Sequence, residues 1–319
     1  MTEPILPPLA RSALERDYQL RSNPELFDLL WAENNTRVLA MHEGKVLLKP
    51  GATIPKLALM PVEAVPTATL RVFLGRTVDS EEAISSGSAI VLAVLSENGA
   101  REIEPESSAW QSLRSIGGVL GDFDAGLFTQ ALALANWHLK HTHCPNCGTP
   151  TVIEQGGWVR RCFKDSMEWF PRIDPAIIVS ILDQQDRLLL GSQASWPENQ
   201  WSILAGFVEP GESLEAAVIR EMHEETGLRV SNPEYIFSQA WPYPLSLMLG
   251  FKARANSEDQ LLPDGEEIVR LRWFSKAELE SEAAKILLPP RSSISRAMIE
   301  LWYGSKILSA RESGNNGDQ

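Results

Sequence analysis

Three glutamates, Glu221, Glu224 and Glu225, stand close together in the stretch REMHEE. If this stretch is helical, at about 100° per residue, Glu224 lies about 60° to one side of Glu221 and Glu225 about 40° to the other. Like charges on one helix face repel one another, so helix stability does not explain the arrangement. A hard divalent cation does, because Mg²⁺ or Mn²⁺ binds carboxylate oxygens and leaves positions for phosphate oxygens and water. The alternative is a solvated acidic face. Arg220, beside the cluster, can orient a carboxylate or supply positive charge to a phosphate.

A second group of chemically capable side chains lies in HCPNCGTPTVIEQGGWVRRCFKD, which contains all three cysteines of the chain, Cys144, Cys147 and Cys162. Three cysteines are too few for a disulfide framework, so a metal site in a reducing compartment is the better interpretation. Asp165 occupies the place of a fourth cysteine, and three thiolates with one carboxylate can hold one structural Zn²⁺ tetrahedrally. His141 or His143 is the alternative fourth ligand, and a ribbon that folds without metal is the alternative to a zinc site.

The elements that must position these groups can be placed from apolar periodicity and helix signals. Ser213 can cap a helix and Gly227 can end it, with no glycine or proline in residues 214–226. Short apolar runs before residue 135 predict a small mixed α/β unit, and residues 124–138 have helical spacing. The predicted segments are an N-terminal α/β domain at 1–138, a zinc ribbon at 139–172, a catalytic α/β domain at 173–308 and a disordered tail at 309–319.

Composition excludes several classes of protein. The chain has 319 residues, of which 44% are apolar, and this is ordinary for a globular protein of about two domains. The net charge of −13 argues against sequence-independent binding of duplex nucleic acid. No apolar run approaches the roughly 20 residues that a membrane helix needs. The first eight residues lack the features of a signal peptide, so we expect a cytoplasmic protein without membrane contact.

The carboxylate stretch resembles the signature of the Nudix hydrolases, G-x5-E-x7-R-E-U-x-E-E-x-G-U, in which U is apolar. Every defined position is matched, by Gly206, Glu212, Arg220, Glu221, Met222, Glu224, Glu225, Gly227 and Leu228. The resemblance implies an α/β/α sandwich of the α+β type and hydrolysis of a nucleoside diphosphate linked to another group. It implies that Glu221, Glu225 and the carbonyl of Ala205 bind the catalytic metal. Glu224 then is a ligand or helps to place the base, and Arg220 belongs to the catalytic group.

Further motifs narrow the resemblance to the NADH pyrophosphatase branch of this family. Ser238–Ser246, SQAWPYPLS, resembles the branch's SQPWPFPxS array, and the two prolines exclude regular helix or central strand. The alternative is a stiff loop over the core. PDGEEIVRLRWF resembles the segment that supplies a further metal ligand. Counting back from Trp273 selects Glu267 and counting forward from Ser246 selects Glu266; we prefer Glu267, because the strand after it fixes the register. The implied substrate-binding residues are Phe170, Phe207, Gln239, Ala240, Trp241, Pro242, Tyr243, Pro244, Leu245, Ser246 and Ser295. Phe170 and Phe207 are a stacking pair for the nicotinamide, or simply core residues.

The resemblance therefore implies an NAD(H) diphosphatase that forms NMN(H) and AMP with Mg²⁺ or Mn²⁺. It also implies removal of NAD caps from RNA 5′ ends, a zinc ribbon before the catalytic domain, and a Nudix-like N-terminal domain used in a homodimer. One alternative is a diphosphatase for ADP-ribose or dinucleoside polyphosphates. Another, of a different class, is a zinc-ribbon binding or regulatory protein whose Nudix domain is inactive.

Overall fold

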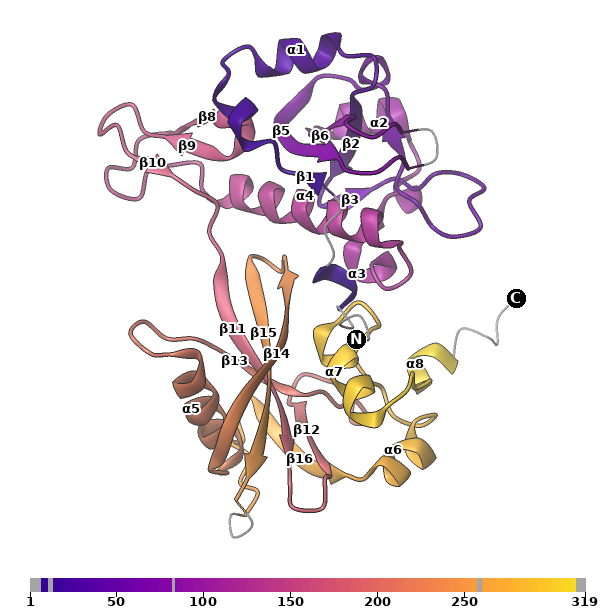
Figure 1. Cartoon of the computed structure of the whole chain (residues 1–319), viewed down its shortest axis with the longest axis vertical. Coiled ribbons are helices and arrows are strands. Elements are labelled where there is room, and N and C mark those ends of the chain that lie inside the picture. Colours follow the sequence, from indigo (N-terminus) through magenta and orange to yellow (C-terminus); the bar gives the residue numbers. More distant parts are fainter. Residues whose placement is uncertain (1–6, 11–13, 82–83, 257–259, 314–319) are drawn as a thin grey trace. The chain divides into compact units, whose positions relative to one another are not determined.

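The computed structural model describes residues 7–10, 14–81, 84–256 and 260–313, which form two compact units (Figure 1). The first unit contains residues 174–240 and 246–313 with the short segment 7–10. The second contains residues 14–173 and 241–245. Residues 241–245 thus belong by their contacts to the second unit, although both neighbouring strands belong to the first.

The first unit is built on a six-stranded mixed sheet in the order β14-β15-β11-β12-β16, with β13 also paired to β11. β11 runs parallel to β15 and antiparallel to β12 and β13. The strands are β11 (Asp174–Leu182), β12 (Leu188–Gln193), β13 (Leu204–Phe207), β14 (Val230–Trp241), β15 (Ser246–Ala255) and β16 (Ile268–Phe274). β11 and β15 are therefore neighbours in the interior of the sheet.

Helices cover both faces of this sheet, and the alternation of side chains along β11 explains why. Ile177 and Val179 pack in one core with residues of α5 (Leu214–Thr226). Ile178 packs in the other core with residues of α6 (Lys276–Glu282) and α7 (Ile294–Tyr303). Because both faces are buried, β11 reads as a continuous apolar run. The predicted α/β/α sandwich is confirmed.

The beginning of the segment predicted to be disordered is ordered. Residues 310–313 form α8 (Ala310–Ser313), and Arg311 donates to the carbonyl of Leu288 over 3.1 Å. Glu312 lies 3.2 Å from the guanidinium of the buried Arg296 of α7. This ion pair attaches α8 to the core, a tertiary interaction that the polar composition of the tail did not reveal. Residues 314–319 lie outside the described part.

The second unit has the same strand connections as the first. Its sheet has the order β1-β5-β6-β2-β3-β7, with β4 also paired to β2, and β2 runs parallel to β6. Thus β5-β6-β2-β3-β7 corresponds to β14-β15-β11-β12-β16, and β4 corresponds to β13. The strands are β1 (Leu14–Glu15), β2 (Arg37–His42), β3 (Lys45–Val46), β4 (Leu59–Met60), β5 (Ala68–Thr77), β6 (Ala89–Leu95) and β7 (Gln111–Ser112). The helices are α1 (Leu26–Ala32), α2 (Glu97–Ile103), α3 (Leu113–Ile116) and α4 (Asp122–Lys140). The expected Nudix-like character of this domain is confirmed by this topology.

The two sheets differ at the connection that carries the glutamates in the first unit. There β13 leads into the 13-residue helix α5. In the second unit β4 leads only into a 3-10 turn, Val62–Ala64, before β5 begins at Ala68. At this connection, whose residues 61–67 are all described, the second sheet therefore has no α-helix on which a carboxylate face can form.

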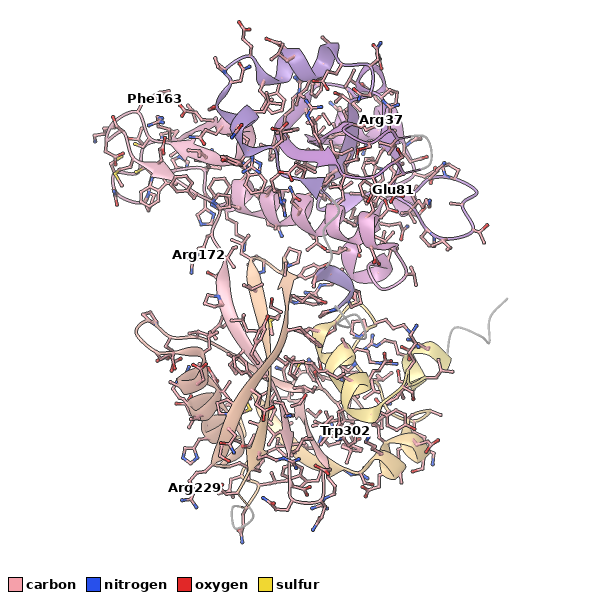
Figure 2. All side chains as sticks on the ribbon, in the orientation of Figure 1. Arg37, Glu81, Phe163, Arg172, Arg229 and Trp302 are labelled. Carbon is pink, nitrogen blue, oxygen red and sulfur yellow. The ribbon has the colours of Figure 1, made fainter. Side chains whose placement is uncertain are left out.

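A small three-stranded sheet in the order β10-β9-β8 follows α4 and belongs to the second unit. Its strands are β8 (Val152–Glu154), β9 (Val159–Arg161) and β10 (Glu168–Trp169). The indole N–H of Trp158 donates to the carbonyl of Phe73 on β5 over 2.7 Å. Phe163, in the turn between β9 and β10, is exposed (Figure 2). In the first unit, the indole N–H of Trp302 of α7 donates to the carbonyl of Asp186 over 3.0 Å (Figure 2).

His138 joins α4 to this small sheet from a buried position. Its Nδ1 accepts from the guanidinium of Arg160 over 2.9 Å, which leaves Nε2–H to donate to the carbonyl of Gly157 over 2.8 Å. Burial lowers the pKa of His138 from 6.5 to about 4, and the nearby Arg160 charge acts in the same direction. The imidazole is therefore neutral in the folded protein. Across the described residues, no helix is long and apolar enough to cross a bilayer.

We predict that the second unit loses stability in acid through His138. The unfolded chain protonates His138 below about pH 6.5, and the folded chain does so only below about pH 4. The contribution of the neutral His138 to the free energy of unfolding is therefore complete above pH 6.5 and falls as the pH drops toward 4. The decrease in the free energy of unfolding is on the order of 3 kcal/mol. Urea unfolding of wild type and His138→Gln between pH 7 and 4 measures it, with His223→Gln, a change of an exposed histidine, as control. Parallel pH profiles for wild type and His138→Gln would contradict this assignment.

Candidate active site and zinc site

The three clustered glutamates lie on α5, whose ends are formed as the sequence predicts. The hydroxyl of Ser213 accepts from the backbone N–H of Ala216 over 3.1 Å, and Gly227 ends the helix with a left-handed φ of 72°. The preceding strand β13 pairs with β11, so the connection from 208 to 213 is anchored at both ends. The rigid helix and the central sheet therefore hold the carboxylates in place.

Arg220 is the centre of the hydrogen-bond network in this cluster. Its guanidinium makes five hydrogen bonds: two to Glu212 (2.6 and 3.2 Å) and one each to Glu221 (2.9 Å), Glu224 (3.0 Å) and the carbonyl of Phe207 (3.0 Å). The charge of Arg220 lowers the pKa of Glu212. Since a guanidinium has five N–H groups, Arg220 is placed to orient carboxylates, which is one of the two roles that the sequence allowed.

Glu221 lies directly against the backbone of Gly206. A Cβ at position 206 would overlap the Glu221 carboxylate, so only glycine allows this approach. Burial raises the pKa of Glu221, although the Arg220 guanidinium acts in the opposite direction. Ala205, the residue before this glycine, is held in β13 by pairing with Ile178 of the central strand. The strand backbone and the helix carboxylate thus meet at Ala205–Gly206.

Glu225 is the most unusual carboxyl group of the cluster. It is only 6% exposed, and its Oε2 has no hydrogen-bond partner among the described residues. Burial, followed by the charges of Glu267 and Glu221, raises its pKa to about 8. A buried oxygen without a partner is costly in a folded protein unless something else binds it.

Glu267 faces this cluster from the segment just before β16. Gln193 of β12 donates to its carboxylate over 3.0 Å. Asp264 orders the segment, because its Oδ1 accepts the backbone N–H groups of residues 266, 267 and 268 over 2.6, 2.8 and 3.1 Å. Of the two glutamates that the sequence offered, Glu267 is the one whose charge raises the pKa of Glu225.

These residues fit a hard divalent cation. Carboxylates from α5 and from the start of β16 converge, and one of them is buried with an oxygen that lacks a protein partner. Oxygen ligands of this kind suit Mg²⁺ or Mn²⁺. Without a cation the same charges repel one another, and this repulsion adds to burial in raising the pKa of Glu225.

The cysteine cluster is assembled with Asp165 and neither histidine. Ligand atoms of Cys144, Cys147, Cys162 and Asp165 all lie within 4.8 Å of one another. Met167 donates its backbone N–H to Asp165 Oδ1 over 3.0 Å, and Oδ2 lies 3.2 Å from Cys144 Sγ. Gly148, with φ of 69°, closes the turn by donating to the carbonyl of Cys144 over 2.8 Å. Three sulfur atoms and one oxygen so close together fit a tetrahedral Zn²⁺ site.

The aromatic array divides between strand and turn. Residues 238–241 are the end of β14, an edge strand, and the prolines lie in the turn 242–245. The prediction that the prolines exclude a central strand is confirmed for residues 242–245. Residues 238–241, however, form strand and not loop. Trp241 and Tyr243 form an edge-on ring pair at 4.9 Å, and the Arg114 guanidinium lies 3.8 Å from the Tyr243 ring centre. Burial raises the pKa of Tyr243 to about 12.

Several residues that the resemblance assigned to substrate are buried and bonded to protein. Gln239, 1% exposed, accepts from the backbone N–H of Leu9 over 3.3 Å and donates to the carbonyl of Ser292 over 3.0 Å. Ser295, 3% exposed, accepts from the backbone N–H of Ile203 over 3.2 Å. Leu245 and Ser246 are buried as well. In this structure these side chains join segments of the fold.

Phe170 and Phe207 are both surface residues. They are 62% and 59% exposed, so the alternative that they are core phenylalanines is wrong. Phe207 ends β13, and its carbonyl accepts from Arg220. Phe170 belongs to the second unit and Phe207 to the first. Exposed aromatic rings are free to stack on a planar ligand.

Sequence reasoning missed three residues that support these sites. Gln193 holds Glu267, and Asp264 orders the segment that carries it. Asn136 of α4 donates to the carbonyls of Pro242 and Pro244 over 2.8 and 3.2 Å, which holds the turn of the array. Asp264 stands in the sequence PDGEE, a turn signal that could have been read as a cap for the following N–H groups. The other two contacts have no local signal.

Comparison with known proteins agrees with this geometry. Residues 172–297 match the family model described as "NUDIX domain", residues 35–137 the "NADH pyrophosphatase-like rudimentary NUDIX domain", and residues 139–166 the "NADH pyrophosphatase zinc ribbon domain". The "NAD-capped RNA hydrolase NudC" of Mycobacterium tuberculosis is 36% identical over 314 residues, which cover 93% of this chain and 95% of that protein. The chain is a Nudix hydrolase of the NADH pyrophosphatase branch. The resemblance inferred from the motifs is confirmed.

Other relatives of this Nudix hydrolase match a smaller part of it. "NAD-capped RNA hydrolase NUDT12" of Homo sapiens is 36% identical over 197 residues, which cover 57% of this chain and 42% of that protein. A solved NUDIX hydrolase from Nitrosomonas europaea has 23% identity and a TM-score of 0.39, with coverage of 52% of this chain and 96% of that chain.

We predict that the ribbon of this Nudix hydrolase retains about one zinc ion per chain through Asp165. Asp165→Ala removes one of four ligands, so zinc affinity falls at least about tenfold. Metal analysis of protein purified without chelator, followed by competition with a chromogenic chelator, measures both quantities. His143→Ala is the matched control and leaves affinity unchanged. Full zinc affinity in Asp165→Ala would mean that His141, His143 or water is the fourth ligand.

Proposed function

We propose that this Nudix hydrolase cleaves the diphosphate of NAD(H) with water to give NMN(H) and AMP, and that it removes NAD from RNA 5′ ends. The observation that carries the chemistry is the buried carboxylate of Glu225, which faces Glu221 and Glu267 without a protein partner for its Oε2. The substrate assignment is supported by the relatives named NAD-capped RNA hydrolases and by the aromatic array of this chain.

The proposed roles follow from the contacts of each residue. Glu221, Glu225, Glu267 and the carbonyl of Ala205 hold the catalytic cation, which when bound neutralises the diphosphate and makes a water molecule more acidic. Arg220 keeps Glu221 and Glu224 in place through its hydrogen bonds. The Glu224 side chain is 59% exposed. It can therefore place or deprotonate the attacking water, or complete the metal site.

The nicotinamide half is recognised by aromatic groups in this proposal. We assign stacking on the flat base to the exposed rings of Phe170 and Phe207, and a further contact with the substrate to the aromatic turn of Trp241 and Tyr243. The buried Gln239 and Ser295 act through the backbone segments that they hold.

The remaining assignments concern the setting of the reaction. We propose Mg²⁺ or Mn²⁺ as the catalytic metal, a homodimer as the assembly and the cytoplasm as the location. The net charge of −13 supports a local contact with the capped RNA end instead of binding along a duplex. ADP-ribose is the main competing substrate, since it carries the same diphosphate without a base at one end.

We predict that Glu225→Gln lowers kcat for NADH at least about a hundredfold, on the scale of a lost electrostatic stabiliser. At pH 7 the metal-free carboxyl, with a pKa of about 8, is mostly protonated, so the neutral amide changes the melting temperature little. Glu215→Gln, an exposed change on the same helix, is the control and keeps full activity. If Glu225→Gln keeps its activity, Glu225 is not a ligand of the catalytic metal.

We predict that Phe170→Ala and Phe207→Ala lower kcat/KM for NADH about tenfold or more, because each loses stacking of roughly 0.5–1.5 kcal/mol and buried area. ADP-ribose has no base at this position, so its kcat/KM falls less. Analysis of products from NADH, ADP-ribose and NAD-capped RNA, with Mg²⁺ and with Mn²⁺, gives the ratios. Phe163→Ala, a change of an exposed ring on the ribbon, is the control. Equal losses for both substrates would place the nicotinamide elsewhere.

A further inference from the structure

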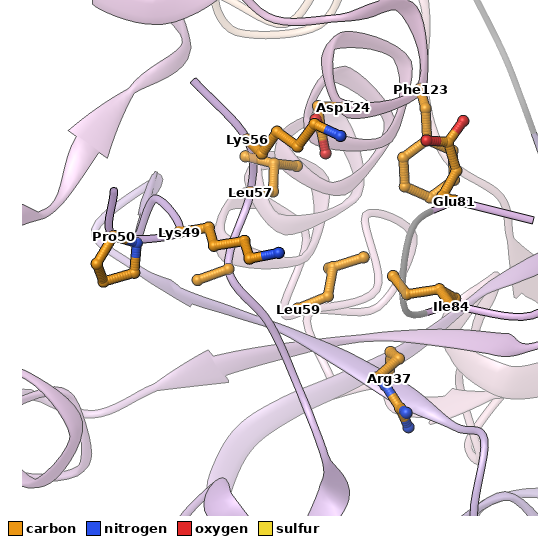
Figure 3. A pocket seen from close by; sticks show the side chains of 11 residues that line it. Arg37, Lys49, Pro50, Lys56, Leu57, Leu59, Glu81, Ile84, Phe123 and Asp124 are labelled. Carbon is orange, nitrogen blue, oxygen red and sulfur yellow. The ribbon is translucent and has the colours of Figure 1, made fainter. Parts of the chain in front are cut away.

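A pocket of about 270 Å³ in the second unit has cations that the fold already uses (Figure 3). Lys49, Lys56 and Asp124 of its lining have interaction partners in the chain. Arg37, also in the lining, donates to two backbone carbonyls. The cations of this pocket are therefore engaged, and the reactive side chains of the second unit lie elsewhere, in the cysteine cluster.

The three cysteines of the cluster differ in exposure. Cys144 and Cys162 are only 1% and 0% exposed, whereas Cys147 is partly exposed. The loop that begins at Cys162 reaches the surface, since Phe163 and Asp165 are both exposed (Figure 2). Oxidation of cysteine follows exposure. A small oxidant in solution therefore meets the sulfur of Cys147 before the other two.

A second sulfur atom lies close beside Cys147. Its Sγ is 3.5 Å from Sγ of Cys162 and 3.3 Å from the hydroxyl oxygen of Thr149. Since a disulfide bond is about 2.0 Å long, the two sulfur atoms need to approach by only about 1.5 Å. Cys144 instead faces Asp165, whose Oδ2 lies 3.2 Å from its Sγ. The pair that is placed to react is therefore Cys147 with Cys162.

The composition of the cluster makes it sensitive to the loss of this pair. Bound zinc keeps cysteines as thiolates, which is the form that oxidants attack and the form that binds metal. Oxidation of one pair leaves Cys144 and Asp165, and one thiolate with one carboxylate do not complete a four-ligand site. A ribbon with four cysteines would keep two thiolates after the same event. The carboxylate of Asp165 therefore makes this site easier to empty.

Backbone hydrogen bonds shape the two loops of the cluster independently of any metal. The N–H of Cys144 donates to the carbonyl of Thr149 over 2.8 Å in the first loop. The N–H of Cys162 donates to the carbonyl of Met167 over 2.9 Å in the second. A disulfide from Cys147 to Cys162 joins the same two loops that a shared zinc ion joins. The oxidised ribbon can therefore keep its shape and take up zinc again after reduction.

We propose that Cys147 is a site of oxidation by hydrogen peroxide, that it forms a disulfide with Cys162, and that the ribbon thereby releases its zinc. This inference depends on the cysteine cluster and is independent of the substrate proposed for the catalytic unit. In a reducing compartment such a disulfide is transient, and thiols reverse it.

The reaction has two balanced steps. The thiolate of Cys147 attacks one oxygen of hydrogen peroxide, so that an S–O bond forms, the O–O bond breaks and hydroxide leaves. The thiolate of Cys162 then attacks the sulfur of this sulfenic acid, so that the S–S bond forms, the S–O bond breaks and a second hydroxide leaves. The two sulfur atoms lose two electrons and the peroxide gains them. Two protons from solvent convert the hydroxides into water.

Treatment of the zinc-loaded full chain with hydrogen peroxide tests the proposal, with a chromogenic chelator for zinc and a thiol assay. All three cysteines of the chain lie in the cluster, so the thiol count reports on it alone. We expect about one zinc ion released for each pair of thiols lost, with one thiol left per chain. Reduction with dithiothreitol, removal of the reductant and addition of zinc restore binding. Zinc that stays bound after peroxide treatment, or that leaves without a disulfide, would overturn the proposal.

Peptide mapping identifies the cysteines that pair. Trypsin cuts after Arg160 and Arg161, which leaves Cys144 and Cys147 in one peptide and Cys162 in another. The proposed disulfide therefore joins two peptides, and alkylation before digestion labels Cys144. A disulfide within the first peptide, or a label on Cys147, would show that the assignment is wrong.

Cys147→Ser and Cys144→Ser are a matched pair, because each removes one thiol of the cluster. Their rates of thiol loss are compared with that of wild type in zinc-free chains, so the zinc affinity of a variant does not enter. Cys147→Ser slows the reaction at least about tenfold, since only buried sulfur atoms are left. Cys144→Ser keeps the reactive pair, so its rate stays within about threefold of wild type and the joined peptides form. Equal rates in the two variants would contradict the role of Cys147.

Discussion

The burial of one carboxylate beside other acidic groups is the constraint on which the site of the first unit depends. Glu225 lies in the interior, and burial, followed by the charges of Glu267 and Glu221, raises its pKa to about 8. Arg220 offsets the repulsion among the other carboxylates of α5, because it binds Glu212, Glu221 and Glu224 at once. The repulsion that remains makes the site receptive to a cation, since a positive ion at this point restores the charge balance. The capped helix, the central strand and Gly206 are what keep these groups from moving apart.

The two sheets share one strand order but differ at the connection that carries the clustered glutamates in the first unit. Both have a central strand paired in parallel with the second strand of a hairpin, and both pair it with a short third strand. Only the first sheet continues into a helix of 13 residues, which gives the carboxylates a common face. The second sheet continues into the 3-10 turn Val62–Ala64 instead, so it lacks such a face at this connection. The shared strand order therefore does not by itself supply the carboxylates of the first unit.

The aromatic array connects the catalytic sequence to the second unit. Its strand portion completes the catalytic sheet, while its turn of residues 241–245 contacts Asn136 and Arg114 of the second unit. The prolines remove backbone donors from the turn, and Asn136 satisfies two of its carbonyls from outside. A turn held in this way keeps its shape without the help of a ligand.

Local rules were sufficient for much of this protein. The helix of the glutamates, its two ends and the shared face of Glu221, Glu224 and Glu225 follow from residue types and the 3.6-residue period. The cysteine spacing predicted the ribbon, whereas the α/β/α sandwich was implied by the resemblance that the motifs carry. These features depend on neighbours a few residues apart, which is the range over which a sequence pattern carries direct physical meaning.

Contacts between distant segments were decided only by the tertiary structure. The burial of Glu225, the effect of the Glu267 charge on its pKa and the support from Gln193 arise where α5, β12 and β16 meet. The exposure of Phe170 and Phe207, and the burial of Gln239 and Ser295, reversed what residue type alone indicates. The recurrence of the strand order in the second unit was implied by the resemblance alone and not by any repeat of sequence, since hydrogen-bonded pairing can repeat without one. The sequence alone determined which groups could act and on which elements they lie. Burial and charge depend on what packs around a group, and only the folded chain decides that.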